Sequence, residues 1–306
     1  MTKVFIDGSA GTTGLRIHER LAARADLELL ILPEEARKDP AARRDMLKAA
    51  DIAFLCLPDA AAIEAVSLAE GCNVRIIDTS TAHRVNPDWT YGFAELTGYD
   101  KIAAATRVAN PGCHASGFLA LTAPLVRAGL LKSDAALTCF SLTGYSGGGK
   151  KMIADYEKED RSPLLKGPRQ YALGQAHKHL PEMVQIAGLE NTPVFCPVVG
   201  DFYSGMEVTV PVFAKDLMGT VEELKTVYRE TYKRGLVRFT EDEGEGGFLS
   251  ASAFSGRDDM EVRVAGNADR VLLVARFDNL GKGASGAAIQ NMNVVLGVNE
   301  STGLVV

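Results

Sequence analysis

The sequence has few cysteines, no excess of positive charge and no long hydrophobic run, and each shortage excludes a class of protein. Five cysteines in 306 residues, none of them in a C-x-x-C pair, argue against a disulfide framework and indicate a reducing compartment. The net charge of −6 provides no basic field for nucleic acid. No apolar run approaches the length of a membrane span. Because residues Met1 to Ile6 already enter strand-like sequence, we expect no signal peptide, and we expect a cytoplasmic protein without membrane or nucleic-acid partners.

What is present is the composition of a soluble globular protein that is long enough for two domains, with 46% hydrophobic and 24% charged residues. Over residues 1–110, short apolar strands alternate with helical stretches, which predicts a parallel sheet covered on both faces. The predicted strands are Val4–Ile6, Leu27–Leu32, Ile52–Leu57, Val74–Ile77 and about Ile102–Val108.

After Cys113 the pattern changes to strands with few helices, which predicts a mixed, largely antiparallel sheet. These strands are Ala136–Leu142, Val194–Val199, Glu207–Phe213, Leu236–Phe239, Glu261–Val264 and Val271–Phe277. Thr220 and Glu223 form a capping box that opens a helix. We therefore predict an α/β protein with a Rossmann-type domain at residues 1–112 and a second, α+β domain with the mixed sheet at residues 113–282. The terminal segment, residues 283–306, is predicted to pack its helix back on the first domain.

A glycine-rich segment follows the first predicted strand and opens a helix. Glycines at such a junction allow the backbone to approach a pyrophosphate, which the helix N-terminus then binds. The spacing G-x-x-G-x-x-G departs from the usual G-x-G-x-x-G, so a tight turn without a ligand is the alternative. The position at the first strand–helix junction favours a cofactor loop, with contacts from Gly8, Ser9, Gly11, Thr12, Thr13 and Gly14.

The choice between NAD and NADP stays open at this level. A ribose-binding acid is expected near the end of the second strand, where Glu34 and Glu35 lie. Arg37 and Lys38 follow them and would suit a 2′-phosphate.

Cys113 stands where a strand ends and an apolar helical run, Ala115 to Leu131, begins. The first turn of a helix carries unpaired N–H groups and the positive end of the helix dipole, which stabilise a thiolate. Pro111 and Gly112 predict a sharp turn just before it. The alternative is a buried structural cysteine.

Two of the five histidines, His177 and His179, lie two residues apart in the segment A-H-K-H-L-P-E. A cysteine nucleophile needs a partner that moves protons near neutral pH, so one histidine is predicted to be catalytic and the other to contact substrate. A zinc site is the rival interpretation, and a surface pair without a role is the third.

Three further segments contain candidate ligand-binding residues. Ser80 and Arg84 follow a strand at the sheet edge where α/β proteins bind ligands, and Arg84 would suit a phosphate or carboxylate, or is an ordinary surface arginine. A loop containing Ser146 and Gly147 is expected to close over substrate or cofactor, or to be a flexible turn. Asn279 is expected to reach the cofactor amide.

Together these segments resemble the N-acetyl-gamma-glutamyl-phosphate reductase family of the arginine pathway, in its shorter form, over most of the chain. R-V-A-N-P-G-C at 107–113 is similar to the family's active-site signature, and H-K-H-L-P-E at 177–182 is similar to its H-R-H-T-P-E segment. Y-G-F-A-E-L at 91–96 and the segment 279–293 also fit. Aspartate-semialdehyde dehydrogenase shares the cysteine and the late D-N-L segment but lacks H-x-H-x-P-E, which favours the acetylglutamyl family.

Three positions depart from the family pattern. His114 stands where the family usually has tyrosine, and Lys178 and Leu180 replace arginine and threonine. His114 places a second imidazole beside the sulfur, so the sequence leaves open whether His114, His177 or His179 carries the proton.

The resemblance implies that the domain at residues 113–282 is the catalytic and dimerisation domain. It also implies NADPH as cofactor, a homodimer or homotetramer, Cys113 as nucleophile and His179 as acid–base. The expected reaction is reduction of N-acetylglutamyl phosphate to the semialdehyde through a Cys113 thioester, with release of inorganic phosphate. Substrate contacts are expected from Ser80, Arg84, Asn110, His177 and Glu182. The alternatives are an aspartate-semialdehyde dehydrogenase-like acyl-phosphate reductase and a nucleotide-binding redox sensor without catalysis.

Overall fold

The computed structural model describes residues 1–242 and 244–306, and the chain divides into two compact units. Unit 1 comprises Met1–Pro111 and Ala284–Leu304, and unit 2 comprises Gly112–Gly283 and Val305–Val306. In the part of the chain that is described, no helix is both long enough and apolar enough to cross a membrane.

Unit 1 contains a six-stranded sheet of order β2-β1-β3-β4-β6-β5 in which every neighbouring pair is parallel. Because β1 lies between β2 and β3, the strand order reverses there, and ligands bind parallel sheets outside such a reversal. The strands are β1 (Thr2–Asp7), β2 (Leu27–Leu30), β3 (Ile52–Leu55), β4 (Arg75–Asp78), β5 (Thr90–Tyr91) and β6 (Arg107–Ala109).

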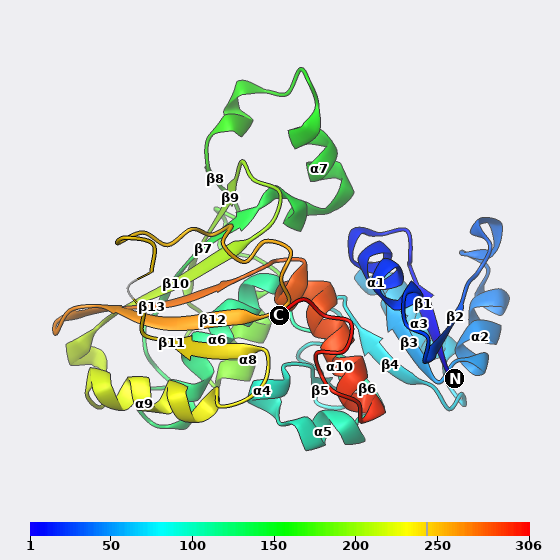
Figure 1. Ribbon diagram of the computed structural model, residues 1–306, viewed down its shortest axis with the longest axis horizontal. Helices are drawn as coiled ribbons and strands as arrows, with labels where there is room; N and C mark the ends of the chain where they lie inside the picture. Colours follow the sequence, from blue (N-terminus) through cyan, green and yellow to red (C-terminus); the bar gives the residue numbers. More distant parts are fainter. Residues whose placement is uncertain (243) are drawn as a thin grey trace. The chain divides into compact units, whose positions relative to one another are not determined.

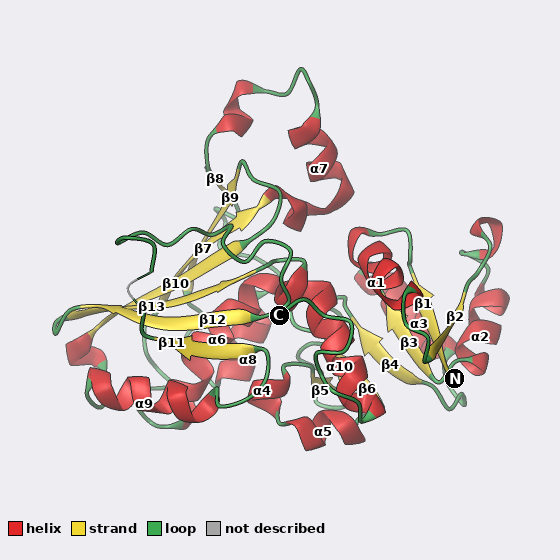
Figure 2. Cartoon of the chain, in the orientation of Figure 1, coloured by secondary structure: helices red, strands yellow, loops and turns green. Residues whose placement is uncertain are grey.

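Helices cover both faces of this sheet, as Figures 1 and 2 show. One face packs Val4, Ile77 and Val108 against α1, α5 and α10, and the other packs Phe5, Ala53 and Ile76 against α2 and α3. The C-terminal helix therefore completes the core of unit 1. The helices are α1 (Thr12–Ala22), α2 (Pro40–Ala49), α3 (Asp59–Leu68), α4 (Ala94–Thr97), α5 (Tyr99–Ala104) and α10 (Gly286–Leu296), with the short helix η1 (Glu34–Ala36).

Unit 2 contains a seven-stranded mixed sheet of order β11-β12-β13-β10-β7-β9-β8. The pairs β11–β12 and β7–β9 are parallel and the other four are antiparallel. Its strands are β7 (Thr138–Gly144), β8 (Arg169–Gln170), β9 (Val194–Gly200), β10 (Met206–Phe213), β11 (Val237–Thr240), β12 (Met260–Gly266) and β13 (Arg270–Phe277).

Helix α6 (Cys113–Arg127) packs on one face of this sheet, against β10 and β13, and contacts α8 (Leu180–Ala187) and α9 (Val221–Thr231). A Cβ on Gly117 would lie 2.5 Å from Val208 Cγ2 and 2.9 Å from Phe277 Cε1, so this glycine permits the close approach. The same unit contains α7 (Gly149–Glu157) and the short helices η2 (Tyr145–Gly148), η3 (Pro163–Lys166) and η4 (Ala214–Asp216). The π-turn η5 (Gly281–Ser285) begins in unit 2 and ends in unit 1.

The predicted fold class is confirmed: a parallel Rossmann-type sheet and a mixed sheet. The capping box is also confirmed, since Thr220 Oγ1 accepts from Glu223 N and the Glu223 carboxylate accepts from Thr220 N. The predicted strand Ile102–Val108 is wrong over its first half, because Ile102 to Ala104 belong to α5. Ile102 is a buried residue of an amphipathic turn there, and one apolar residue fits either period.

Candidate functional site

The glycine-rich loop of unit 1 forms a cradle at the carboxyl ends of β1 and β3. Gly8 has φ +88°, and a Cβ there would lie 2.3 Å from the Cys56 carbonyl oxygen. A Cβ on Gly14 would lie 2.4 Å from the Gly8 carbonyl oxygen. Only glycine fits these two positions, so the loop backbone lies flush against its neighbours and leaves its outer side accessible.

The cradle fits a dinucleotide in two further respects. A cavity of about 210 Å³ lies beside it, lined by residues 5–10, Leu15, His18, residues 29–32 and Arg37. The Thr12 hydroxyl, in the first turn of α1, is buried without a hydrogen-bond partner among the described residues. A buried polar atom of this kind is expected to acquire a partner when the phosphate site is filled.

The predicted phosphate-binding residues Ser80 and Arg84 follow the carboxyl end of β4, also in unit 1. Arg84 is buried, with Nε donating to the Asn110 carbonyl at 3.0 Å and Nη2 donating to the Thr79 carbonyl at 3.1 Å. Ser80 is buried too, and its hydroxyl donates to Asp78 Oδ2 at 2.7 Å. The two predicted residues therefore share one turn. The Ser80 hydroxyl, however, already donates its hydrogen bond to the Asp78 carboxylate.

Asn110 has a structural environment. Its amide nitrogen donates to the Ala284 carbonyl at 3.0 Å, and its amide oxygen accepts from Asn291 Nδ2 at 3.1 Å. Asn110 is 1% exposed, and these hydrogen bonds hold the end of β6. The substrate contact expected of Asn110 stays a prediction.

Cys113 is the first residue of α6 in unit 2, with Gly112 as N-cap. The Gly112 N–H donates to Glu182 Oε2 at 3.1 Å, and the Gly112 carbonyl accepts from Ser116 N at 2.8 Å. Cys113 is partly exposed, as a nucleophile must be. Its sulfur is thus attached at the positive end of a 15-residue helix dipole, which favours the thiolate.

Glu182 was expected to bind substrate, and the structure gives it another contact. The residue is 1% exposed and its carboxylate accepts the Gly112 N–H. It lies in the first turn of α8, so it ties that helix to the turn before Cys113. Sequence spacing could not show this pairing across 70 residues.

His177 and His179 lie at the start of α8, with His179 as its N-cap. Their ring centroids are 4.7 Å apart, and His177 Nδ1 accepts from the His179 backbone N–H at 3.2 Å. Because Nδ1 is an acceptor, neutral His177 has its proton on Nε2. No group of three or more His, Cys, Asp or Glu that could hold a metal ion such as zinc is found within residues 1–242 and 244–306.

His114 is 3% exposed and has both ring nitrogens engaged. Nδ1 bonds Ser141 Oγ at 2.7 Å and Nε2 bonds Tyr171 Oη at 2.6 Å. Its ring lies 5.5 Å from that of His177 and 5.6 Å from that of His179. Burial, with a smaller effect of His177, lowers the pKa of His114 to about 3. A histidine with this pKa stays neutral near pH 7, which favours His177 or His179 over His114 as the proton carrier.

Tyr171 is a neighbour that sequence reasoning missed. Burial, and secondarily the charge of Cys113, raises the pKa of this phenol well above its usual range, so it remains a neutral donor. The following loop has two non-glycine residues at positive φ, Ala172 and Gln175. The Gln175 amide holds that loop by donating to the Phe195 carbonyl at 2.7 Å and accepting from Phe195 N at 2.8 Å.

The remaining predicted cofactor residues meet in unit 2. Asn279 Nδ2 donates to Ser146 Oγ at 2.9 Å, and Asn279 Oδ1 accepts from Gly205 N at 2.9 Å. A Cβ on Gly147 would lie 3.5 Å from Asn279 Nδ2. Asn279 therefore anchors the 146–147 turn, and its amide is already hydrogen-bonded at both ends.

The comparisons first define a class. Residues 33–105 match the family model "Semialdehyde dehydrogenase, NAD binding domain", and residues 113–279 match "Semialdehyde dehydrogenase, dimerisation domain". Aspartate semialdehyde dehydrogenase II from Vibrio cholerae is similar in structure, with a TM-score of 0.73 and 17% identity over 97% of this chain and 98% of that one. The enzyme from Francisella tularensis gives 0.72 and 16% over 97% and 100%. The fold is that of the semialdehyde dehydrogenases.

The sequence relatives then define the family within that class. N-acetyl-gamma-glutamyl-phosphate reductases from Brucella suis and Brucella ovis are each 48% identical over 306 residues, covering 96% of this chain and 99% of the relative. The chain belongs to the N-acetyl-gamma-glutamyl-phosphate reductase family.

We expect His114 to make the free energy of unfolding depend on pH below about 6.5. The folded pKa of about 3 lies below the ordinary value of 6.5, so the unfolded chain binds one more proton between these pH values. The stabilisation from keeping His114 neutral is complete above pH 6.5 and is lost as the pH falls toward 3. His114→Gln should remove this dependence, at up to about 1.4 kcal/mol per pH unit.

Urea unfolding at pH 8, 6.5, 5.5 and 4.5 measures it. The pH 8 values serve as the reference, because the imidazole is neutral in both states there. A difference between wild type and variant that stays constant across the series would contradict the assignment of His114 as a neutral residue.

Proposed function

We propose that the protein reduces N-acetylglutamyl phosphate to N-acetylglutamate semialdehyde, with release of inorganic phosphate. The observation that carries the proposal is the placement of Cys113 at the first residue of α6, in the unit that also holds His177 and His179 at the start of α8. Family membership supplies the substrate class, since the curated relatives are named for this reaction.

In the proposed mechanism, the Cys113 thiolate attacks the acyl carbon and forms a C–S bond. The C–O bond to the phosphoryl group breaks, and phosphate leaves with the electron pair, which gives a thioester on Cys113. Arg84 would neutralise the phosphate in the substrate and in the leaving group. The turn at Gly112, fixed by Glu182, holds the sulfur in place.

A nicotinamide cofactor, when bound, supplies the hydride that reduces the acyl carbon. Residues 8–14 would hold its pyrophosphate. His179, 5% exposed at the N-cap of α8, would then provide and recover the proton as the C–S bond breaks and the aldehyde forms. His177 would orient the substrate.

We expect Cys113→Ser to keep NADPH binding and lose almost all turnover, because the serine hydroxyl is a much weaker nucleophile than the thiolate. His179→Ala should lower kcat by roughly 10²–10⁴-fold. The assay follows phosphate-dependent reduction of NADP by N-acetylglutamate semialdehyde.

Cys72→Ser, at a partly exposed thiol of unit 1, is the matched control and should retain normal rates. Ordinary turnover in Cys113→Ser would end the proposal. A larger loss in His177→Ala than in His179→Ala would exchange their roles. Preference for aspartate semialdehyde would assign the chain's activity to the related dehydrogenases.

For the cofactor, we propose NADPH over NADH. Arg37 lines the cavity beside the glycine-rich loop, and its Nε is buried without a hydrogen-bond partner among the described residues. Glu34 and Glu35 are exposed and do not line that cavity, although Glu34 Oε1 lies 3.7 Å from Arg37 Nη1. The guanidinium is suited to a 2′-phosphate.

Arg37→Met should therefore raise the KM for NADPH by about tenfold or more, as loss of a charge-assisted bond predicts, and leave the KM for NADH nearly unchanged. Lys38→Met is the control, because Lys38 is exposed and does not line the cavity. Equal effects on the two cofactors would show that Arg37 does not recognise the phosphate.

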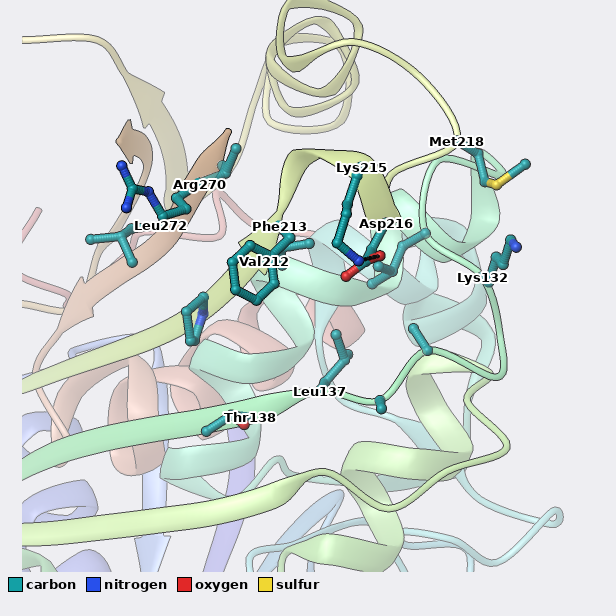
Figure 3. A pocket seen from close by; sticks show the side chains of 15 residues that line it. Lys132, Leu137, Thr138, Val212, Phe213, Lys215, Asp216, Met218, Arg270 and Leu272 are labelled. Atoms are coloured by element: carbon teal, nitrogen blue, oxygen red, sulfur yellow. Dashed lines mark hydrogen bonds and ion pairs between the residues drawn. The ribbon is translucent and has the colours of Figure 1, made fainter. Parts of the chain in front are cut away.

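We also propose that two copies of the chain pair through the uncovered face of the unit 2 sheet. Phe213 is 56% exposed on β10 and Leu272 is 41% exposed on β13, where it pairs with Pro211. A hollow of about 760 Å³ with a mainly apolar lining opens there, and Figure 3 shows Phe213, Leu272, Leu137 and Thr138 around it. The matching family model is described as a dimerisation domain. An exposed apolar face of this kind is typical of a subunit interface.

Light scattering should then give about twice the chain mass of 32.7 kDa, and Leu272→Glu combined with Phe213→Glu should weaken pairing by about tenfold or more. Leu164→Glu is the control, at an exposed leucine of η3. A monomeric wild type, or a double variant that pairs normally, would contradict this interface.

For the cellular location, we propose the cytoplasm. The support is that the five cysteines are free thiols, as is usual in a reducing compartment.

A further inference from the structure

We propose that Asp78 and His83 are positioning residues for phosphate, acting through the turn of residues 78–84 that contains Ser80 and Arg84. The inference rests on the proposed function, because it assigns the supports of the group proposed to bind the acyl phosphate. Neither residue was predicted from the sequence to have a role.

The Asp78 carboxylate is the centre of this turn. It is 0% exposed, and three donors converge on it: Ser80 N at 2.9 Å, Ser80 Oγ at 2.7 Å and His83 Nδ1 at 2.6 Å. The turn is therefore closed around one buried carboxylate group at the carboxyl end of β4.

The His83 ring is held on two sides. Nδ1 donates to Asp78, and the ring stacks on Trp89 with centroids 4.1 Å apart and planes at 13°. The Asn86 N–H donates to the His83 carbonyl at 3.1 Å, and the Trp89 N–H donates to the Asn86 carbonyl at 3.1 Å. These contacts leave the imidazole one orientation, with a proton on Nδ1.

Arg84 follows His83 directly and depends on the same turn. Its Nη2 donates to the carbonyl of Thr79, which lies between Asp78 and Ser80, and its Nε donates to the carbonyl of Asn110. If the bond between His83 and Asp78 is lost, the turn that carries Thr79 loses a fixed point, and the guanidinium loses part of its orientation. A displaced guanidinium weakens bidentate phosphate binding without changing the thiol.

A positioning role and a merely structural role of Asp78 and His83 therefore predict different kinetic changes. Disruption should raise the KM for inorganic phosphate in the phosphate-consuming direction and leave kcat at saturating phosphate nearly unchanged. A structural role would lower thermal stability or kcat without selecting phosphate.

Two variants separate hydrogen bonding from packing. His83→Phe keeps a ring against Trp89 and removes the donor, and it should raise the KM for phosphate by about fivefold or more. His83→Asn places an amide donor near the position of Nδ1 and should stay within about twofold of wild type. The rate of Cys113 alkylation should be the same in all three proteins. Equal KM values for the two variants, or a loss confined to kcat, would overturn the proposal.

A second measurement needs no substitution. Trp89 is the chain's single tryptophan and stacks on His83, so its fluorescence reports on the surroundings of this stack. Phosphate added to the wild-type protein should change this emission with a midpoint near the KM for phosphate, and chloride at equal ionic strength should not. An emission unaffected by phosphate would contradict the proposal even if His83→Phe does not fold.

Failure of the proposed function gives a different result. A wild-type protein whose semialdehyde oxidation does not saturate with phosphate would refute the function itself. Normal phosphate saturation in wild type with an unaltered KM in His83→Phe would refute only the positioning role.

Discussion

The hydrogen bond from the Gly112 N–H to the Glu182 carboxylate is the contact on which the arrangement of unit 2 depends. It joins the turn before Cys113 to the first turn of α8, so the helix that begins with the cysteine is tied to the helix capped by His179. A buried carboxylate must be satisfied by donors, and this requirement fixes the geometry of both helix starts. Gly117 contributes the close seating of α6 on Val208 and Phe277.

Burial then gives similar side chains different chemistry. Burial raises the pKa of the Cys56 thiol to about 12, which makes it inert, while Cys113 is partly exposed at a helix N-terminus. Among the histidines, His114 is kept neutral by burial and bonded at both nitrogens, and it bridges Ser141 and Tyr171. The histidine that replaces the family's usual tyrosine is thus a support of the site.

Much of the fold followed from periodicity. Continuous apolar segments such as Ile52–Leu55 predicted parallel strands buried on both faces, and the alternation of β10 predicted a strand with one covered face. The short helix α5 was mistaken for a strand, because Ile102 is a single apolar residue that fits either pattern. The two-residue strand β5 has too little sequence to show any period.

The sequence by itself determined the chemistry-bearing groups: a cysteine at a strand–helix junction, a histidine pair and a glycine-rich loop, because local spacing specifies turns and helix starts. Only the tertiary structure decided what each polar group is bonded to. Glu182 and Asn110 form hydrogen bonds with partners 70 and 174 residues away, which sequence spacing does not show. Tyr171, Asp78 and His83 became candidates for a role at the site because each forms hydrogen bonds with a buried polar partner. Such partners are set by packing, which no local pattern of residues encodes.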